Sequence, residues 1–463
     1  LGAFQLFHDE AERLFSTSFL AAAKSLDRIS FDPQGVYEFA FNVFPTGNDS
    51  VLNELKRLGP RQQIELTLDG PIRVEVEKPL PKRARRATLA ERIEQTASDL
   101  RALVAPFAEF YGDKIQCPLS GGLDSRLALG LLRDAGVKPH VYVYGAPGDE
   151  DVEIARAISD GEGFDLEVFE KAKHKAITPD DFAAIVERNF HETDALVTDG
   201  GLFDNGGNAA ARHARQEGGQ LAVSGGCGEV FRNFFYLADR RMTAREVVRA
   251  FFTRYTLGDV TSAFDEDDFL TKLELKALRA VGEVDRKRRL PRAMIEQLYP
   301  RLRCRAFFGR EISLVGRQGG YLMPFFDHGI VAEALTLPIA LKNAGRFESA
   351  LLNHIDPTLA AYPSGYGYSF DSDPTLEHRL SELGTRVRPP WIRQQSYALR
   401  RRLGRISDEH GGLLTNAFLG RVIDLHYPHM SRFFRVEKIE DSGLYRRVAT
   451  LEYLGQHLEG RLA

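Results

Sequence analysis

The residues best suited to chemistry form a short stretch rich in glycine and serine, SGGLDS, at residues 120–125. It follows a strand-like apolar stretch and opens a helical one, so it occupies a strand-to-helix turn. The first N–H groups of a helix lack partners and carry partial positive charge, which makes such a turn an anion site. Gly121 and Gly122 let the backbone approach phosphate oxygens, and Ser120 and Ser125 add hydroxyl donors. The stretch therefore predicts a phosphate-binding loop.

Asp124, inside the same loop, has a different predicted role. A carboxylate repels phosphate, but it can hold Mg²⁺ beside the phosphates. The loop lacks the lysine of the GxxxxGK[ST] pattern, which argues against the usual cradle for a γ-phosphate. A glycine-rich turn can also serve close packing alone. However, the five fixed positions of SGGxDS arise by chance in only about one chain in a thousand of this length, which favours phosphate binding.

Alternating strand-like and helical patterns surround the loop and should position it. The strand-like stretches are 114–119, 140–145, 166–170 and 220–226. The helical stretches between them include 126–136, 151–159 and 178–190. Strands separated by helices pair in parallel, and such sheets bind ligands at the carboxyl ends of their strands. We therefore predict an α/β fold, with a parallel sheet flanked by helices and mostly helical structure beyond about residue 240.

The clearest seam in the chain is KPLPKRARR, residues 78–86. Before it, residues 62–78 alternate apolar and polar side chains across a turn at Asp69-Gly70, which predicts a hairpin. After it, Thr88 and Glu91 form a capping box that opens a helix, and Pro106 should bend or end that helix. We predict two domains, residues 1–80 and residues 88–463.

Composition excludes several classes of function. The chain has 463 residues, is 43% hydrophobic and carries a net charge of -4, which gives no general attraction for nucleic acid or anionic membrane. Its three cysteines include no CxxC pair, so neither a disulfide framework nor a structural zinc site is supported. No apolar run reaches the ~20 residues that span a bilayer. We expect a cytoplasmic protein, and its first residue, Leu rather than Met, suggests a processed or trimmed chain.

Ser120, Gly121, Gly122, Asp124 and Ser125 resemble the pyrophosphate loop of the ATP pyrophosphatase superfamily. The rest of the chain is similar to one branch of it, the asparagine synthetase family. Residues 191–231 resemble that family's stretch from ET to SGEGxDE(L/V)F, and residues 322–338 resemble its PFLD segment. The resemblance implies an adenine nucleotide alpha hydrolase-like fold with a helical C-terminal region. It also implies that residues 1–80 are a small, β-rich, partial glutaminase-like domain.

The resemblance implies a reaction as well. In the family, the loop grips the β- and γ-phosphates of ATP while a substrate carboxylate attacks the α-phosphate. Pyrophosphate leaves, and ammonia or an amine then converts the acyl-adenylate to an amide. ATP and Mg²⁺ are thus the implied cofactors, with Mg²⁺ held by Asp124 and Glu229. Four further positions match nucleotide contacts of the family: Leu119 and Tyr144, whose backbones flank the adenine, and Ser224 and Gly225, which contact the ribose or adenylate.

The sequence departs from the family pattern in three places. The family's glutaminase uses an N-terminal cysteine, whereas residue 1 is Leu, so the nitrogen should come from ammonia or another amine; a separate ammonia source and a homodimer both remain open. Gly226 replaces a glutamate associated with aspartate, which favours a specialised acceptor: a uronic acid sugar, a peptide or a small-molecule carboxylate. A family lysine is missing from residues 361–370.

Several cations can replace that lysine. Lys342 is one candidate, and Arg126 directly follows the loop and can reach a phosphate or form a surface salt bridge. The remaining candidates are Arg310, Arg317 and Arg346. Two other functions stay open beside the amide synthase: asparagine synthetase proper, and a degenerate scaffold that binds nucleotide without catalysis.

Other features allow a plain structural interpretation. Tyr366, Tyr368 and Phe370 either pack in the core or lie near the acceptor pocket. We interpret the basic run 398–406 as a solvated helix face. Surface or internally satisfied histidines are the favoured interpretation of the following three: His191, His213 and His328.

Overall fold

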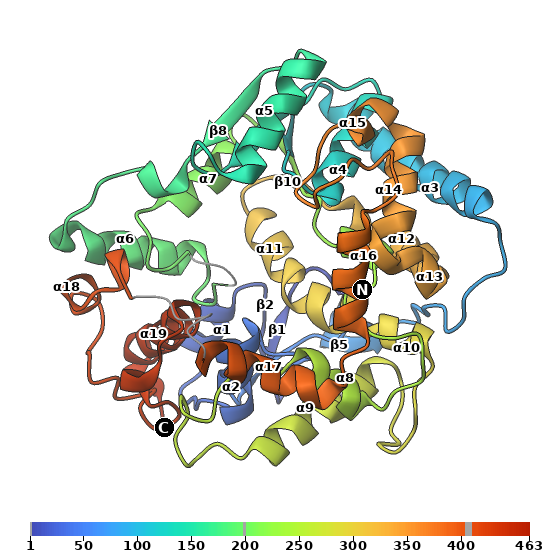
Figure 1. The fold of residues 1–463 in the computed structure, drawn as a ribbon. Coiled ribbons are helices and arrows are strands. Elements are labelled where there is room, and N and C mark those ends of the chain that lie inside the picture. The colour runs from blue at the N-terminus through green and yellow to red at the C-terminus, as the bar shows by residue number, and fades with distance from the viewer. Residues whose placement is uncertain (1, 198–200, 403–409) are drawn as a thin grey trace.

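The computed structural model describes residues 2–197, 201–402 and 410–463. At its centre is a five-stranded parallel sheet with the strand order β10-β9-β6-β7-β8 (Figure 1). Its strands are β6 (Ile115–Pro118), β7 (His140–Tyr144), β8 (Leu166–Phe169), β9 (Leu221–Val223) and β10 (Gly320–Leu322). The predicted α/β class and the first four strands are confirmed. The edge strand β10 was missed, because three residues carry too little alternation to stand out among helical patterns.

Helices connect and flank these strands. The segments that follow β6, β7 and β8 begin with α4 (Leu123–Asp134), α5 (Glu150–Glu162) and α6 (Pro179–Glu192), and α7 (Gly207–Ala214) precedes β9. The chain runs outward from β6 through β7 to β8, then crosses to the opposite side of β6 to form β9. This reversal makes the boundary between β6 and β9 the topological switch point, where doubly wound sheets bind their ligands.

Helix α3 (Leu89–Tyr111) precedes β6 and begins as predicted. The Thr88 hydroxyl accepts from the Glu91 N–H, and the Glu91 carboxylate accepts from the Thr88 N–H at 2.7 Å. Pro106 lies inside the helix, which continues to Tyr111, so the prediction that it can end the helix is wrong. Its ring lies on the exposed side, while Leu100 and Val104 anchor the opposite face in the core.

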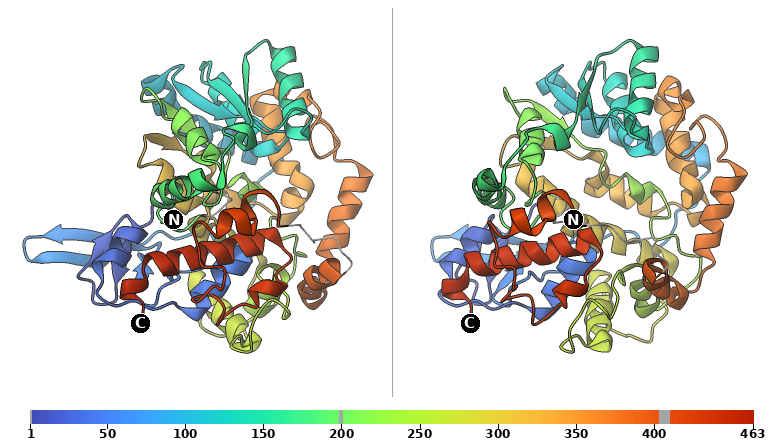
Figure 2. Two further views of the ribbon diagram at one scale, coloured as in Figure 1. Left: turned by 90° about the vertical axis from the view of Figure 1, so that its left-hand side faces the viewer. Right: turned by 60° about the vertical axis from the view of Figure 1, so that its left-hand side comes forward.

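Residues before the seam form short strands and two helices. These are β1 (Phe7–Asp9), β2 (Phe15–Ser16), β3 (Leu55–Arg57), α1 (Phe19–Ser25) and α2 (Pro33–Asn42). The predicted hairpin is confirmed as β4 (Gln62–Thr67) and β5 (Gly70–Glu75), and Figure 2 shows it projecting from the rest of the protein. Helix α2 packs against the C-terminal helix α19 (Ser442–His457), where Arg447 Nε donates to the Ala40 carbonyl at 2.6 Å.

The remaining chain is mainly helical, as predicted. Its helices are α8 (Ala244–Phe251), α9 (Glu266–Ala280), α10 (Arg292–Glu296), α11 (Phe308–Val315), α12 (His328–Leu335), α13 (Ile339–Lys342), α14 (Arg346–Ile355), α15 (Pro357–Ala361), α16 (Leu376–Arg386), α17 (Pro390–Arg402) and α18 (Asn416–Leu419). Within the described ranges, no helix is both long enough and apolar enough to cross a membrane.

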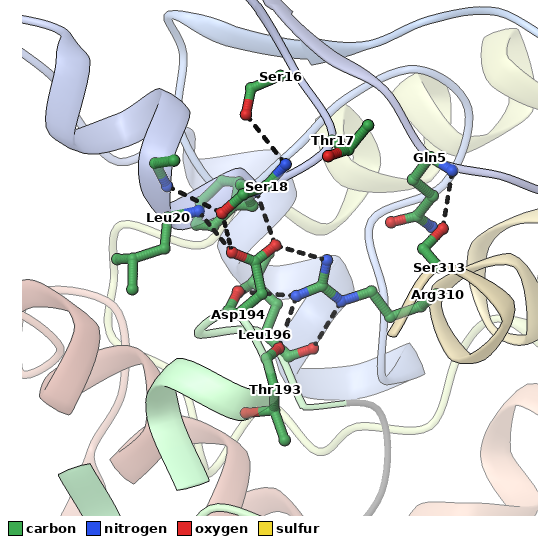
Figure 3. A network of polar contacts seen from close by, with 12 residues as sticks. Gln5, Ser16, Thr17, Ser18, Leu20, Thr193, Asp194, Leu196, Arg310 and Ser313 are labelled. Atoms are coloured by element: carbon green, nitrogen blue, oxygen red, sulfur yellow. Dashed lines mark hydrogen bonds and ion pairs between the residues drawn. The ribbon is translucent and has the colours of Figure 1, made fainter. Parts of the chain in front are cut away.

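Asp194 joins the N-terminal segment to the nucleotide-fold half of the chain (Figure 3). Its buried carboxylate accepts the Ser18 hydroxyl and, at 2.7 Å, the Phe19 N–H at the start of α1. Arg310 on α11 and Arg317 just after it each approach the same carboxylate at 3.2 Å. Both arginines, which the sequence left as candidate phosphate-binding cations, are therefore engaged at this junction.

Replacing Asp194 with asparagine should destabilise the protein by about 3 kcal/mol at neutral pH, because it leaves the buried Arg310 without its carboxylate. Burial alone would raise the pKa of Asp194, but Arg310, Ser18, Leu20 and Arg317 together hold it below 3.8. A depressed folded-state pKa gives stability that is present above the unfolded-state value and is lost as the pH falls through the folded-state value. Urea unfolding should therefore show the deficit of the variant shrinking below about pH 4. Asp160→Asn, on the exposed face of α5, should change neither the stability nor its pH dependence.

Candidate functional site

The SGGLDS loop lies between β6 and α4, as predicted, and forms a compact turn. The Ser120 N–H donates to Ser125 Oγ at 3.0 Å, and the two serine hydroxyls lie 2.9 Å apart. The Gly121 N–H donates to a carboxylate oxygen of Asp151, on α5, at 2.7 Å. Gly122 is the N-cap of α4 and supplies no side-chain acceptor to the first turn of that helix. The turn thus already binds one anionic oxygen, and the uncapped start of α4 offers further donors.

The segment that follows β9 packs directly against this loop. A side chain at Gly225 would place its Cβ 2.8 Å from the Asp124 carbonyl carbon and 2.9 Å from the Ser125 nitrogen. Ser224 N–H donates to the Leu322 carbonyl at 2.9 Å, and Ser224 Oγ accepts from the Gly226 N–H at 3.1 Å. The predicted nucleotide-contacting residues Ser224 and Gly225 therefore lie beside the loop, at the switch point of the sheet.

Gly225→Ala should push the β9 segment away from α4 and cost about 1–3 kcal/mol of stability, because backbone atoms cannot move aside as side chains do. The thermal midpoint should fall, and ATP affinity measured by calorimetry should fall with it. Gly384→Ala is the matched control, because Gly384 lies in α16 with open space around its Cβ position. That control should leave ATP binding unchanged; equal behaviour of the two variants would contradict the close packing at Gly225.

Leu119 and Tyr144 lie at the carboxyl ends of the neighbouring strands β6 and β7. The Leu119 N–H donates to the Tyr142 carbonyl at 2.8 Å, so the sheet pairing continues to the edge of the loop. The Tyr144 hydroxyl donates to the Ala211 carbonyl at 3.4 Å, and the Lys171 ammonium lies 3.9 Å from its ring centre. Both residues therefore share one edge of the sheet with the SGGLDS loop.

Asp124 is the centre of a charged cluster. Both of its carboxylate oxygens lie 2.7 Å from Arg232 Nη2. Arg232 Nε lies 3.1 Å from a carboxylate oxygen of Glu348 on α14, and Arg232 Nη1 donates to the Tyr366 hydroxyl at 2.7 Å. The Glu348 side chain is fully buried. One guanidinium thus joins the loop, a buried carboxyl on α14 and the tyrosine loop at residues 361–370.

The charge state of Glu348 is set by its surroundings. Burial, followed by repulsion from Asp124, raises the pKa of Glu348 well above its usual value, although Arg232 opposes this shift. Neither carboxyl oxygen of Glu348 has a hydrogen-bond partner among the described residues. Two buried oxygens next to Asp124 are therefore free to bind a cation or a proton.

The residues around Asp124 fit the predicted magnesium site. Glu229, which the sequence paired with Asp124, accepts from the Tyr299 hydroxyl at 2.6 Å and lies within electrostatic range of Arg232. Together with Glu348 these residues supply hard carboxylate oxygens of the kind that Mg²⁺ prefers. A divalent cation here would share Asp124 with Arg232.

Lys342 and Arg126 differ in how they relate to this cluster. Lys342 Nζ is buried, donates to the Val230 carbonyl at 2.7 Å and lies 3.0 Å from a Glu296 oxygen; burial lowers its pKa. Arg126 is also fully buried, but its guanidinium donates to main-chain carbonyls of residues 359–363. The same loop donates from the Gly365 N–H to the Gly121 carbonyl at 3.2 Å. This geometry gives Arg126 a positioning role and does not point its guanidinium at a phosphate on the loop.

A cavity of about 980 Å³ opens beside the charged cluster. Its lining includes Leu123, at the start of α4, together with Glu229, Arg232, Lys342 and Tyr366. Tyr368 also lines it, which agrees with a place near an acceptor pocket, whereas Phe370 packs in the core. Of the residues matched to ATP contacts, the following lie at the sheet edge and not in the lining: Leu119, Ser120, Gly121, Gly122, Ser125, Tyr144, Ser224 and Gly225.

Other sequence candidates lie away from this site. His191 and His213 are exposed and contact Glu187 and Glu192 at 2.8 and 3.5 Å. Arg346 is exposed and does not line the cavity. Residues 403–406 of the basic run fall outside the described residues.

Sequence reasoning missed Arg232 and Glu348. Arg232 comes three residues after Glu229 in the same motif, and that proximity was the available signal. Glu348 gave none, because its role depends on contact with residues far away in the chain. In comparisons with known proteins, no family model matches the sequence and no curated protein proves similar to it.

Proposed function

We propose that this chain is an ATP-dependent, AMP-forming ligase of the asparagine synthetase type, which joins a carboxylate to ammonia or an amine. The observation that carries the proposal is the position of the SGGLDS loop. It lies at the switch point of a parallel sheet, leaves the start of α4 uncapped, and places Asp124 against the wall of a large cavity.

The proposed reaction has two steps. A carboxylate oxygen of the acceptor attacks the α-phosphorus, the bond to the bridging β-phosphate oxygen breaks, and pyrophosphate leaves. The amine nitrogen then attacks the activated carbonyl carbon, loses a proton, and AMP leaves with the former carboxylate oxygen. Such a reaction needs positioning and electrostatic stabilisation more than a covalent nucleophile.

Each part of the site has a role in this scheme. The N–H groups of the loop and the hydroxyls of Ser120 and Ser125 would bind the departing pyrophosphate, as the anionic oxygen of Asp151 is bound to Gly121 now. Asp124 and Glu229 would hold Mg²⁺, with Glu348 as a further oxygen donor. When bound, the ion would neutralise charge on the phosphates. Lys342 and Arg232 are the nearest cavity cations to supply the charge of the missing family lysine.

The cavity is the proposed site of the acceptor: a uronic acid sugar, a peptide or a small-molecule carboxylate. Ammonia or an amine would come from outside the chain, and we propose neither a nucleic-acid partner nor a membrane span for this cytoplasmic activity. Free aspartate, as in asparagine synthetase proper, is the simplest alternative acceptor. A homodimer is compatible with the proposal.

A nucleotide-binding scaffold without catalysis is a second candidate. The bidentate contact between Asp124 and Arg232 favours it, because this pairing satisfies the carboxylate that a magnesium ion would need.

Pyrophosphate release separates the two candidates. The protein is incubated with ATP, Mg²⁺ and ammonium and a panel of carboxylates, and pyrophosphate and AMP are quantified. The ligase predicts equimolar AMP and pyrophosphate that depend on one class of carboxylate. Tight binding of ATP with no pyrophosphate from any acceptor would favour the scaffold, and failure to bind ATP would contradict both.

A further inference from the structure

The cavity wall that faces away from the SGGLDS loop carries excess positive charge. Five of its arginines come from the chain after α8, the turn at residues 299–304, and the α16–α17 region: Arg254, Arg303, Arg388, Arg393 and Arg400. No ion pair with a carboxylate is present at any of the five within the part of the chain that the structure describes. The acidic residues of the lining are Glu229 and Glu382, and burial raises the pKa of Glu382. The wall is therefore cationic.

The guanidinium groups are held in place but keep free donors. Arg393 Nη1 donates to the Phe235 carbonyl at 2.9 Å, and Arg303 stacks over the Phe234 ring at 5.4 Å. Arg388 and Arg400 each bond only a carbonyl one helical turn earlier, at 3.2 and 3.3 Å. Since each guanidinium has five N–H donors, most of these donors face the cavity or its solvent unpaired.

The arginines also repel one another. Desolvation, followed by the charges of Arg303 and Arg400, lowers the pKa of Arg254. Desolvation, Arg388 and Arg254 lower the pKa of Arg393 to about 10, so it still carries a charge at neutral pH. Like charges gathered around one cavity raise the free energy of the empty site, and a bound anion relieves that repulsion.

We infer that this arginine wall binds an anionic group of the acceptor other than the carboxylate that is activated. The acceptor is then a small molecule with at least two acidic groups. The activated carboxylate belongs at the Asp124–Arg232 end of the cavity, so the wall contacts a different part of the same molecule. A cavity of about 980 Å³ is large enough for such a ligand. This inference rests on the proposed function.

Nucleotide phosphates are the other possible source of an anion here. They are disfavoured, because the loop residues other than Leu123 lie outside the cavity lining.

The test measures anion binding without ATP. Propane-1,2,3-tricarboxylate and its uncharged triamide are titrated into the protein by calorimetry. Trp391 is the only tryptophan of the chain and adjoins Ile392 and Arg393 of the lining, so its fluorescence reports local binding. We expect the tricarboxylate to bind and the triamide not to. Arg254→Gln/Arg400→Gln should weaken the tricarboxylate at least about tenfold, the effect of losing one or two charge-assisted hydrogen bonds.

The matched control is Arg156→Gln/Arg188→Gln, which removes the same charge from exposed positions on α5 and α6. It should bind the tricarboxylate like the parent protein. Thermal unfolding checks that the double variants fold, and Arg303→Gln replaces the first if it does not. Absent tricarboxylate binding, equal binding of the triamide, or unchanged affinity in the wall variant would overturn the inference.

A parallel titration with AMP separates the two sources of anion. If the wall variant loses affinity for AMP but not for the tricarboxylate, the wall binds nucleotide phosphates and the inference is wrong. Because the tricarboxylate arm contains no ATP, a protein that binds this probe but never releases pyrophosphate would contradict the proposed function alone.

Discussion

Asp124→Ala should reduce pyrophosphate release by about 10³-fold or more, equivalent to about 4 kcal/mol of transition-state stabilisation. The alanine removes the loop carboxylate that would hold Mg²⁺ against the phosphates, while the amide donors of the loop stay in place. ATP should therefore still bind, but its affinity should no longer rise with Mg²⁺. Initial rates of pyrophosphate formation and calorimetric titrations with and without Mg²⁺ measure the two effects.

Two features make this variant interpretable. Arg232 keeps its ion pair with Glu348 at 3.1 Å, so the guanidinium does not lose every carboxylate. Asp160→Ala changes an exposed carboxylate on α5 and should leave the rate unchanged. Equal rates for Asp124→Ala and the parent protein would show that the loop carboxylate takes no part in the reaction, and the ligase proposal would fail.

The loop was predictable because its information is local. Strand-like residues 114–119 and helical residues 126–136 change their hydrophobic period across six residues of glycine, serine and aspartate. The same argument found β7, β8 and β9. It failed for β10 and for Pro106, because a three-residue strand has no measurable period and one proline on the exposed side of a long helix costs too little to stop it.

The charged cluster was less predictable because its information is distant. Arg232 reaches Asp124 across 108 positions of the chain, and Glu348 becomes unusual only when it is buried beside both. Arg126 shows the opposite error. Its place directly after the loop suggests phosphate contact, but the helix turns its side chain away toward residues 359–363, because successive residues of a helix point in different directions.

Arg232→Met should lower pyrophosphate release by about 10²-fold or more and destabilise the fold by about 3–5 kcal/mol. The activity loss follows if Arg232 supplies positive charge at the reacting phosphate. The stability loss follows because Asp124 and the buried Glu348 are left without their shared cation. These two causes predict the same single-variant result, so the single variant cannot distinguish a reacting residue from a structural one.

A second substitution separates them. Arg232→Met/Glu348→Gln removes the buried carboxyl together with its partner, and replacing both members of a buried pair is far less costly than removing one. The double variant should therefore regain most of the lost stability in urea unfolding. Its rate of pyrophosphate release should stay at least about 10²-fold below that of the parent protein, because methionine brings no charge to the phosphate. A rate that recovers together with the stability would reduce Arg232 to a structural cation, and the positive charge of the reaction would then fall to Lys342, 3.0 Å from Glu296 on the same cavity.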